Sequence, residues 1–159
     1  MAAAAGAVAM AAAAQSRTPH PFNLPLAKDL AADAVASARD RVPIFLFFDR
    51  YDCPYCERAL AQFVVPISRE PAWRDRALYR QVEIDQPLSL VDFDGRATTH
   101  ELLAARYRVS LTPTVFVVDG TGKGIGSPVV GLLTADFYAA YLENAIDAGG
   151  RKLRGDPPS

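Results

Sequence analysis

Cysteine is scarce in this chain, which has only Cys53 and Cys56 among its 159 residues. A disulfide-rich scaffold needs several pairs at longer spacings, so that class of protein is excluded. Neither sign of charge is in excess, because 17 basic and 18 acidic residues leave a net charge of −1. Nucleic acid and anionic membranes are therefore disfavoured as principal partners. The length suits one domain with a hydrophobic core that needs no disulfides.

Charge is absent altogether from the amino-terminal residues 1–16, MAAAAGAVAMAAAAQS. This apolar tract is too short for a membrane span, which needs about 20 residues. It suits the apolar region of a secretory signal, and the alanines before Gln15 fit a cleavage site. The usual basic residues in front are missing, so this interpretation places the natural start further upstream. Two interpretations stay open: a signal or flexible segment over residues 1–20 of a periplasmic, exported protein, or a low-complexity alanine tail of a cytoplasmic one.

The hydrophobic pattern predicts alternating helices and strands in one domain over residues 21–150, with a flexible tail over residues 151–159. In its first half we expect a helix over residues 26–40, a strand over 44–48, a helix over 54–65 that Pro66 ends or kinks, and a strand over 77–84. In its second half we expect a turn at Asp94 and Gly95, a helix from Thr98 or Thr99 through HELLAARY, a strand over 114–118, a glycine-rich turn, a short antiparallel strand over 127–130, and a helix from Thr134 that Gly149 and Gly150 end. This order predicts the α/β class, with a central mixed sheet that is mostly parallel and flanked by helices.

The two cysteines lie in the segment YDCPYCER, after the predicted buried strand and at the first turn of a helix. Pro54 suits this position, because the first helical residue needs no backbone N–H and the fixed φ of proline favours a helix start. The unpaired N–H groups and the positive end of the helix dipole stabilise a thiolate at Cys53. Cys56, one turn further on, is placed to attack a mixed disulfide formed at Cys53. We therefore expect Cys53 to be the exposed thiol and Cys56 to be the shielded one. The pair is therefore predicted to be a centre of thiol–disulfide exchange.

A metal site is an alternative role for the pair. Zinc would need two more ligands, and the chain offers only His20, in a flexible-looking stretch, and His100, on a helix turn that we expect to be exposed. Covalent haem attachment requires a histidine after the second cysteine, where Glu57 stands. We therefore expect neither a metal nor another cofactor. A non-catalytic binding module, whose disulfide stays oxidised, remains a second hypothesis.

The segments FLFFDRYDCPYC (45–56) and LTPTVFVVDGTGK (111–123) resemble the thioredoxin superfamily, and the resemblance extends over about residues 26–148. It implies a thioredoxin fold in which the bond between Thr112 and Pro113 is cis and faces the two cysteines. The loop at Pro113 would present its backbone to an extended substrate segment. The implied site has Cys53 and Cys56 as catalytic residues and Pro54, Tyr55, Thr112 and Pro113 as supporting or substrate-binding residues. The resemblance also implies that Tyr55 is partly exposed.

Within the superfamily, the stretch FDG-x4-HELLAARYRVSLTPT is most similar to periplasmic proteins of the SoxW type and to the C-terminal domain of DsbD. This resemblance implies a monomer that reduces disulfides of exported proteins and takes electrons from a membrane-bound donor of the DsbD or CcdA type. Phe47 stands six residues before Cys53, where thioredoxin carries a buried aspartate, so the group that assists Cys56 is left open. Pro-Tyr between the cysteines is the glutaredoxin dipeptide. Glutaredoxin-like, oxidase or isomerase exchange therefore remain alternatives.

Overall fold

The computed structural model describes residues 22–132 and 134–157. The segment 1–20 and His20 lie outside these ranges. Along the described chain the elements are α1 (Leu30–Asp40), β1 (Ile44–Asp49), α2 (Pro54–Ala59), the π-helical turn η1 (Leu60–Val64), α3 (Val65–Arg69), β2 (Leu78–Glu83), β3 (Ser89–Val91), β4 (Ala97–Thr99), α4 (His100–Arg106), β5 (Thr114–Val118), β6 (Val129–Val130) and α5 (Ala135–Arg154). None of these helices is long and apolar enough to cross a membrane. The predicted α/β class is confirmed.

The central sheet has four strands in the order β2-β1-β5-β6. Strand β1 pairs with β2 in parallel, whereas the pairs of β1 with β5 and of β5 with β6 are antiparallel. The predicted mixed sheet is therefore confirmed, but the expectation that it is mostly parallel is wrong. Parallel neighbours need a long crossover connection. Among the paired strands of this sheet, only β1 and β2 are joined by one, which contains α2, η1 and α3.

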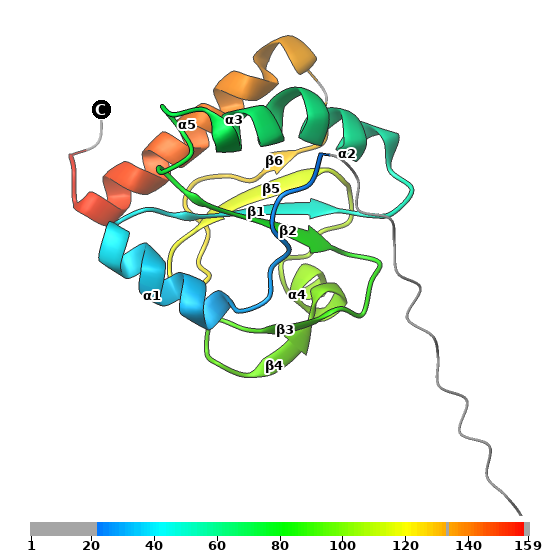
Figure 1. Cartoon of the computed structure of the whole chain (residues 1–159), viewed down its shortest axis with the longest axis horizontal. Helices are drawn as coiled ribbons and strands as arrows, with labels where there is room; N and C mark the ends of the chain where they lie inside the picture. The colour runs from blue at the N-terminus through cyan, green and yellow to red at the C-terminus, as the bar shows by residue number, and fades with distance from the viewer. Residues whose placement is uncertain (1–21, 133, 158–159) are drawn as a thin grey trace, which may run out of the picture.

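Helices cover both faces of the sheet, with α2, α3 and α5 on one face and α1 and α4 on the other (Figure 1). All six residues of β1 are buried, because its alternating side chains supply two cores. Phe45 and Phe47 pack in the cluster that also contains the two cysteines. Leu46 and Phe48 pack in a second cluster on the other face. The strand that leads to the cysteines is therefore fixed by packing on both sides.

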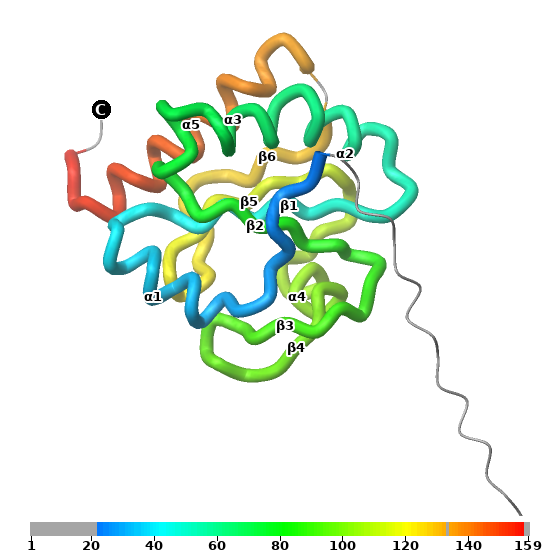
Figure 2. The backbone as a smooth tube through the Cα atoms, in the orientation of Figure 1, coloured from blue at the N-terminus to red at the C-terminus, as the bar shows by residue number. Residues whose placement is uncertain are grey.

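The helix predicted over residues 26–40 begins later, at Leu30. Asp29 is its N-cap, and the carboxylate accepts a backbone N–H of the first turn over 2.8 Å. Before this cap the chain is extended, and Leu26 forms a parallel bridge with Gln81 of β2. Figure 2 shows this blue segment running beside β2. The early apolar residues therefore cover the edge of the sheet instead of forming a helical turn.

The helix that Pro66 was expected to end or kink continues to Arg69. A π-helical turn over Leu60–Val64 precedes the proline, which lies in the first turn of α3. Proline lacks a backbone N–H and crowds the preceding turn, and a wider turn accommodates both effects. The helix therefore changes its winding at this point and does not end.

A small hairpin of β3 and β4 lies outside the central sheet. The turn predicted at Asp94 and Gly95 joins its strands, and Gly95 has a φ of +81°. The two strands were not predicted, because three residues are too few to show an alternating pattern. Thr99, one of the two predicted caps, opens α4 by accepting the N–H of Leu102 over 3.2 Å.

The last helix does not end at Gly149 and Gly150, and the first four residues of the segment 151–159 are not a tail. Helix α5 runs to Arg154 and is capped by Gly155, whose φ is +75°. Gly149 and Gly150 are buried inside the helix. The added Cβ of a larger residue at Gly149 would lie 2.8 Å from its neighbours in the core. This glycine therefore serves close packing and not helix termination.

Candidate active site

Cys53 and Cys56 form a disulfide with an S–S distance of 2.08 Å. Cys53 is the N-cap of α2, and its Sγ accepts the backbone N–H of Cys56 over 3.2 Å. The carbonyl oxygen of Cys53 also accepts N–H groups from Cys56 and Glu57, at 2.9 and 3.1 Å. Pro54 is the first helical residue, as predicted. The sulfur of Cys53 thus lies where a helix start stabilises negative charge.

Both cysteines are buried in this oxidised form, with exposed fractions of 6% for Cys53 and 1% for Cys56. The expectation that Cys53 is exposed is therefore wrong for the disulfide state. Two neighbours cover its sulfur, namely Cys56 through the disulfide and Thr112 through its side chain and carbonyl group. The expected order of the two still holds, because Cys56 is the more shielded residue.

The peptide bond between Thr112 and Pro113 is cis, as the family resemblance predicted. The carbonyl oxygen of Thr112 lies 3.8 Å from Sγ of Cys53, and its Oγ1 donates a hydrogen bond to the same sulfur over 3.5 Å. The sheet creates this contact, because Thr114, the first residue of β5, pairs with Phe48 near the end of β1. The loop before β5 therefore meets the segment that follows β1.

Large side chains next to the disulfide in the sequence are open to solvent. Tyr51 and Tyr55 are each 64% exposed, and Leu111, beside Thr112, is 62% exposed. Tyr51 is held in place because its backbone N–H donates to the carboxylate of Asp85. The expected exposure of Tyr55 is confirmed. Tyr51 and Leu111 were missed as candidates, although their sequence neighbourhood could have suggested them.

A buried carboxylate lies at the end of the strand that leads to the cysteines. Asp49 is 7% exposed and follows Phe45 and Phe47 at the alternating positions of β1. Its Oδ2 accepts a hydrogen bond of 2.7 Å from Nε2 of Gln81, whose Oε1 in turn accepts the N–H of Leu24. This pair was not predicted from the sequence. The useful signal was an acidic residue at an inward position of an otherwise apolar strand.

His100 is not the surface residue that the sequence suggested, since it is 1% exposed. Its Nδ1 accepts the backbone N–H of Glu83 over 3.0 Å, and its Nε2 lies 2.8 Å from the carbonyl oxygen of Ala27. Burial lowers the pKa of the imidazole. The hydrogen bond with Ala27 and the charge of Glu83 raise the pKa, but they offset the effect of burial only in part. The imidazole ring thus links the backbone of Glu83 to the backbone of Ala27. Within residues 22–132 and 134–157, no three His, Cys, Asp or Glu side chains gather as a metal site.

A family model described as a thioredoxin-like domain matches residues 30–146. The chain belongs to this thioredoxin-like family. Among solved structures, a poplar thioredoxin h mutant is 15% identical with a TM-score of 0.57, over 90% of this chain and 95% of that one. Thioredoxin O2 from Arabidopsis thaliana in the oxidised state is 19% identical with a TM-score of 0.51, over 80% and 97%. A thioredoxin-fold protein from Helicobacter pylori is 22% identical with a TM-score of 0.51, over 77% and 93%. No curated protein sequence matches the chain.

The family and the cysteine pair together make the chain a thiol–disulfide oxidoreductase. The solved structures support the fold alone, because their sequences are so distant. The likeness to SoxW-type proteins and to the C-terminal domain of DsbD therefore stays a prediction. The same holds for the individual roles of Cys53, Cys56, Pro54, Tyr55, Thr112 and Pro113.

Proposed function

We propose that this oxidoreductase reduces disulfides of exported proteins through the pair Cys53 and Cys56. The observation that carries the proposal is the position of Cys53, at a helix start and against the loop of Thr112 and Pro113. A helix start stabilises the thiolate that attacks a disulfide, and the loop offers backbone beside the reacting sulfur. The exposed Tyr51 and Tyr55 supply apolar surface for the client next to it.

The reaction runs in two exchange steps. In the first, the thiolate of Cys53 attacks one sulfur of the client disulfide, forms a mixed disulfide and expels the other client sulfur as a thiolate, which takes up a proton. In the second, Cys56 loses its proton and attacks the sulfur of Cys53, which expels the second client thiolate. The client gains two electrons, and the enzyme is left with the disulfide between Cys53 and Cys56. A dithiol donor must then return two electrons to this pair.

Cys56 needs a proton acceptor in the second step because it is buried. Asp49 is our candidate for this group. Its carboxylate lies on the face of β1 that packs with the cysteines, and Gln81 holds it there through a 2.7 Å hydrogen bond. It occupies the next inward position after Phe47, so the buried acid of thioredoxin would act here from two residues further along the strand.

Export is the second part of the proposal, and it rests on the uncharged apolar residues 1–16. In this setting the clients are proteins with disulfides, and the electron donor is a membrane-bound protein of the DsbD or CcdA type. Fusing residues 1–25 to a reporter that is active only outside the cytoplasm tests this part. A silent reporter, even with an upstream start restored, would place the protein in the cytoplasm.

Insulin reduction with dithiothreitol tests the activity. We expect the wild type to accelerate cleavage of the insulin disulfides and Cys53→Ser to abolish the acceleration. Cys56→Ser should accumulate the mixed disulfide, visible as a mass adduct that dithiothreitol releases. A wild type that does not accelerate the reaction would favour the non-catalytic binding module instead.

A further inference from the structure

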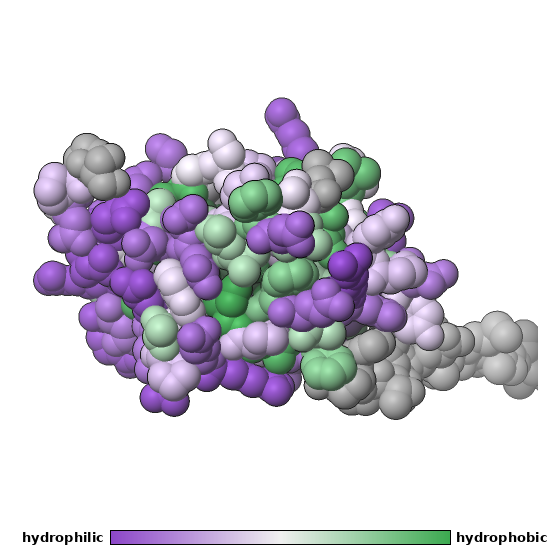
Figure 3. Space-filling model, turned by 90° about the horizontal axis from the view of Figure 1, so that it is seen from above, coloured by the Kyte–Doolittle hydropathy of each residue, from purple (hydrophilic) through white to green (hydrophobic). Residues whose placement is uncertain are grey.

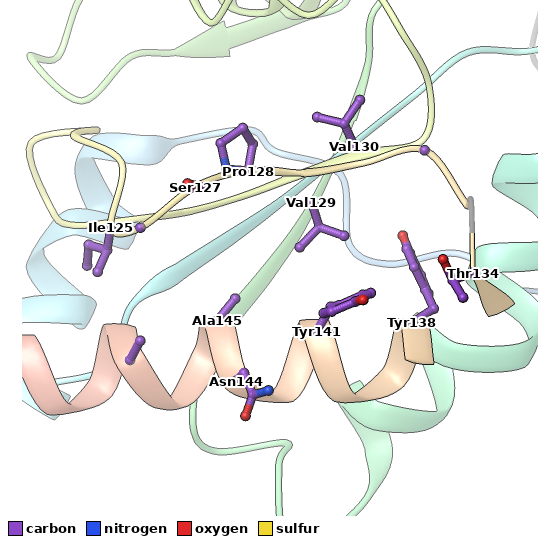
Figure 4. Close-up of a pocket in the computed structure, with 13 residues that line it drawn as sticks. Ile125, Ser127, Pro128, Val129, Val130, Thr134, Tyr138, Tyr141, Asn144 and Ala145 are labelled. Atoms are coloured by element: carbon purple, nitrogen blue, oxygen red, sulfur yellow. The ribbon is translucent and has the colours of Figure 1, made fainter. Parts of the chain in front are cut away.

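A groove of about 520 Å³ runs between β6 and the amino-terminal part of α5. Figure 4 shows Val129 pointing into it from the strand and Tyr141 and Ala145 from the helix. Ile125 lies at one end, and Tyr138 lies near the other. Because a water molecule occupies about 30 Å³, the groove has room for several side chains.

Among the described residues that line this groove, none is Asp, Glu, Lys or Arg. The charged residues Glu143, Asp147 and Arg151 of α5 lie outside it, and Asp147 pairs with Arg151 over 3.0 Å. Figure 3 looks onto the face that carries α3 and α5 and shows hydrophobic side chains toward its middle with hydrophilic ones around them. Tyr141 remains 50% exposed at the groove wall. Such apolar surface gains free energy when a partner covers it.

The groove adjoins the loop that contacts the dithiol, because a residue of its lining is bonded to that loop. Gly131, at its Tyr138 end, donates its N–H to the carbonyl oxygen of Pro113 over 2.7 Å. Pro113 follows Thr112, whose hydroxyl contacts the sulfur of Cys53. A polypeptide that meets Cys53 over this loop therefore reaches the groove without leaving the surface of the enzyme.

The occupant has to bind through side chains, because β6 offers little edge for strand pairing. The strand has two residues, and Pro128 directly before it lacks a backbone N–H. A second copy of the chain therefore gains no β-ladder here. Apolar side chains of a passing segment match the uncharged lining.

We propose that the groove between β6 and α5 binds apolar side chains of a client segment that flanks the disulfide under attack. This inference rests on the proposed reductase function and adds a client class to it. Folded proteins bury most of their large apolar side chains. The clients are accordingly unfolded or partly folded proteins, in which an apolar segment next to a disulfide is accessible.

The test uses two disulfide-cyclised peptides that differ only in the residues flanking the loop, which are Leu, Val and Phe in one and Ser, Gly and Asn in the other. Single-turnover rate constants are measured with fully reduced enzyme by acid quenching and mass spectrometry. Each protein is described by the ratio of its two rate constants, so a general change in reactivity cancels. Tyr141→Asp places a charge on the groove wall. The matched control is Val35→Asp, which makes the same kind of change at a 71% exposed residue of α1, on the other face of the sheet.

We expect the wild type and Val35→Asp to prefer the apolar peptide at least five-fold and Tyr141→Asp to show a ratio near one. A ratio near one for the wild type, or an unchanged ratio for Tyr141→Asp, would overturn the proposal. If Tyr141→Asp does not fold, a competition experiment replaces it. A cysteine-free apolar peptide should slow the reaction of the wild type with the apolar disulfide peptide. An unchanged rate would refute binding of apolar side chains in the groove. A wild type that reduces neither the peptides nor hydroxyethyl disulfide would refute the reductase function itself.

Discussion

Thr112 donates a hydrogen bond from its Oγ1 to the Sγ of Cys53 over 3.5 Å, although 59 positions separate the two residues. The same sulfur accepts the backbone N–H of Cys56. In the reduced enzyme both donors would face a thiolate, and donors to a charged group favour its ionised form. We therefore expect the cis-proline loop to help set the reactivity of the attacking sulfur, in addition to its proposed role of presenting backbone to a client.

Replacing Thr112 with valine should make Cys53 a poorer nucleophile at low pH. The change keeps the side-chain shape and removes the hydroxyl donor, so the thiolate loses one of its stabilising contacts. We expect alkylation of the reduced wild type at mildly acidic pH to label Cys53 before Cys56, as read by peptide mass. In Thr112→Val the pH at which Cys53 is labelled should rise by up to about one unit, since hydrogen bonds to charged groups contribute about 1.5–3 kcal/mol and this one is long. An unchanged profile, or earlier labelling of Cys56, would contradict this account.

Asp49→Asn should slow the resolving step and leave the attacking step at its normal rate. The variant keeps an oxygen that can accept the hydrogen bond from Gln81 but removes the carboxylate that would take up the proton. We expect quenched-flow mass spectrometry to show the mixed disulfide forming at the wild-type rate and decaying about ten-fold or more slowly near pH 7, because general bases typically contribute 10²–10⁴-fold. Equal decay in both proteins would exclude Asp49 as the proton acceptor for Cys56.

The elements and the dithiol could be predicted because their signals are local in sequence. The run IFLFF indicated a buried strand, and Pro54 between the cysteines indicated a helix start. The pairing of Asp49 with Gln81 could not be predicted, because it depends on which strands become neighbours. The apolar groove could not be predicted for the same reason, because it forms only when β6 and α5 lie side by side.

His100 shows most clearly that local sequence patterns do not predict burial. Its burial leads to a testable dependence of the free energy of unfolding on pH. Its folded-state pKa is lowered, mainly by burial, from the ordinary 6.5. Below pH 6.5 the unfolded chain therefore binds a proton that the folded chain resists, so the free energy of unfolding should fall as the pH drops from 7 toward 5.5. One proton limits the slope to about 1.4 kcal/mol per pH unit. Urea titrations should show a smaller slope for His100→Gln, and identical slopes would contradict the assignment.

Two adjacent glycines of α5 should respond in opposite ways to alanine. At Gly149 the new Cβ would lie 2.8 Å from Pro43 Cγ and from Val117 Cγ1 in the core. Overpacking of this kind costs about 1–3 kcal/mol. At Gly150 the close atom is Nη1 at the far end of the Arg154 side chain, which can move. Urea denaturation should therefore show a net loss of stability for Gly149→Ala and a gain of up to about 1 kcal/mol for Gly150→Ala. Similar changes in both variants would argue against close packing at Gly149.

The reduction potential decides the direction in which the enzyme works, and we expect a reductant. Contacts that stabilise the thiolate of Cys53 stabilise the reduced enzyme, which by itself favours oxidation of clients. Against this, the resemblance predicted from the sequence is to proteins that pass electrons to oxidised clients. The described chain between the dithiol and Pro113 also holds short elements and no large helical insertion. We therefore expect a potential on the reducing side of about −200 mV, between the values of glutaredoxins and thioredoxin. Equilibration with glutathione buffers, followed by thiol trapping, measures it directly. A value near about −120 mV, with oxidation of reduced client proteins, would make the enzyme an oxidase.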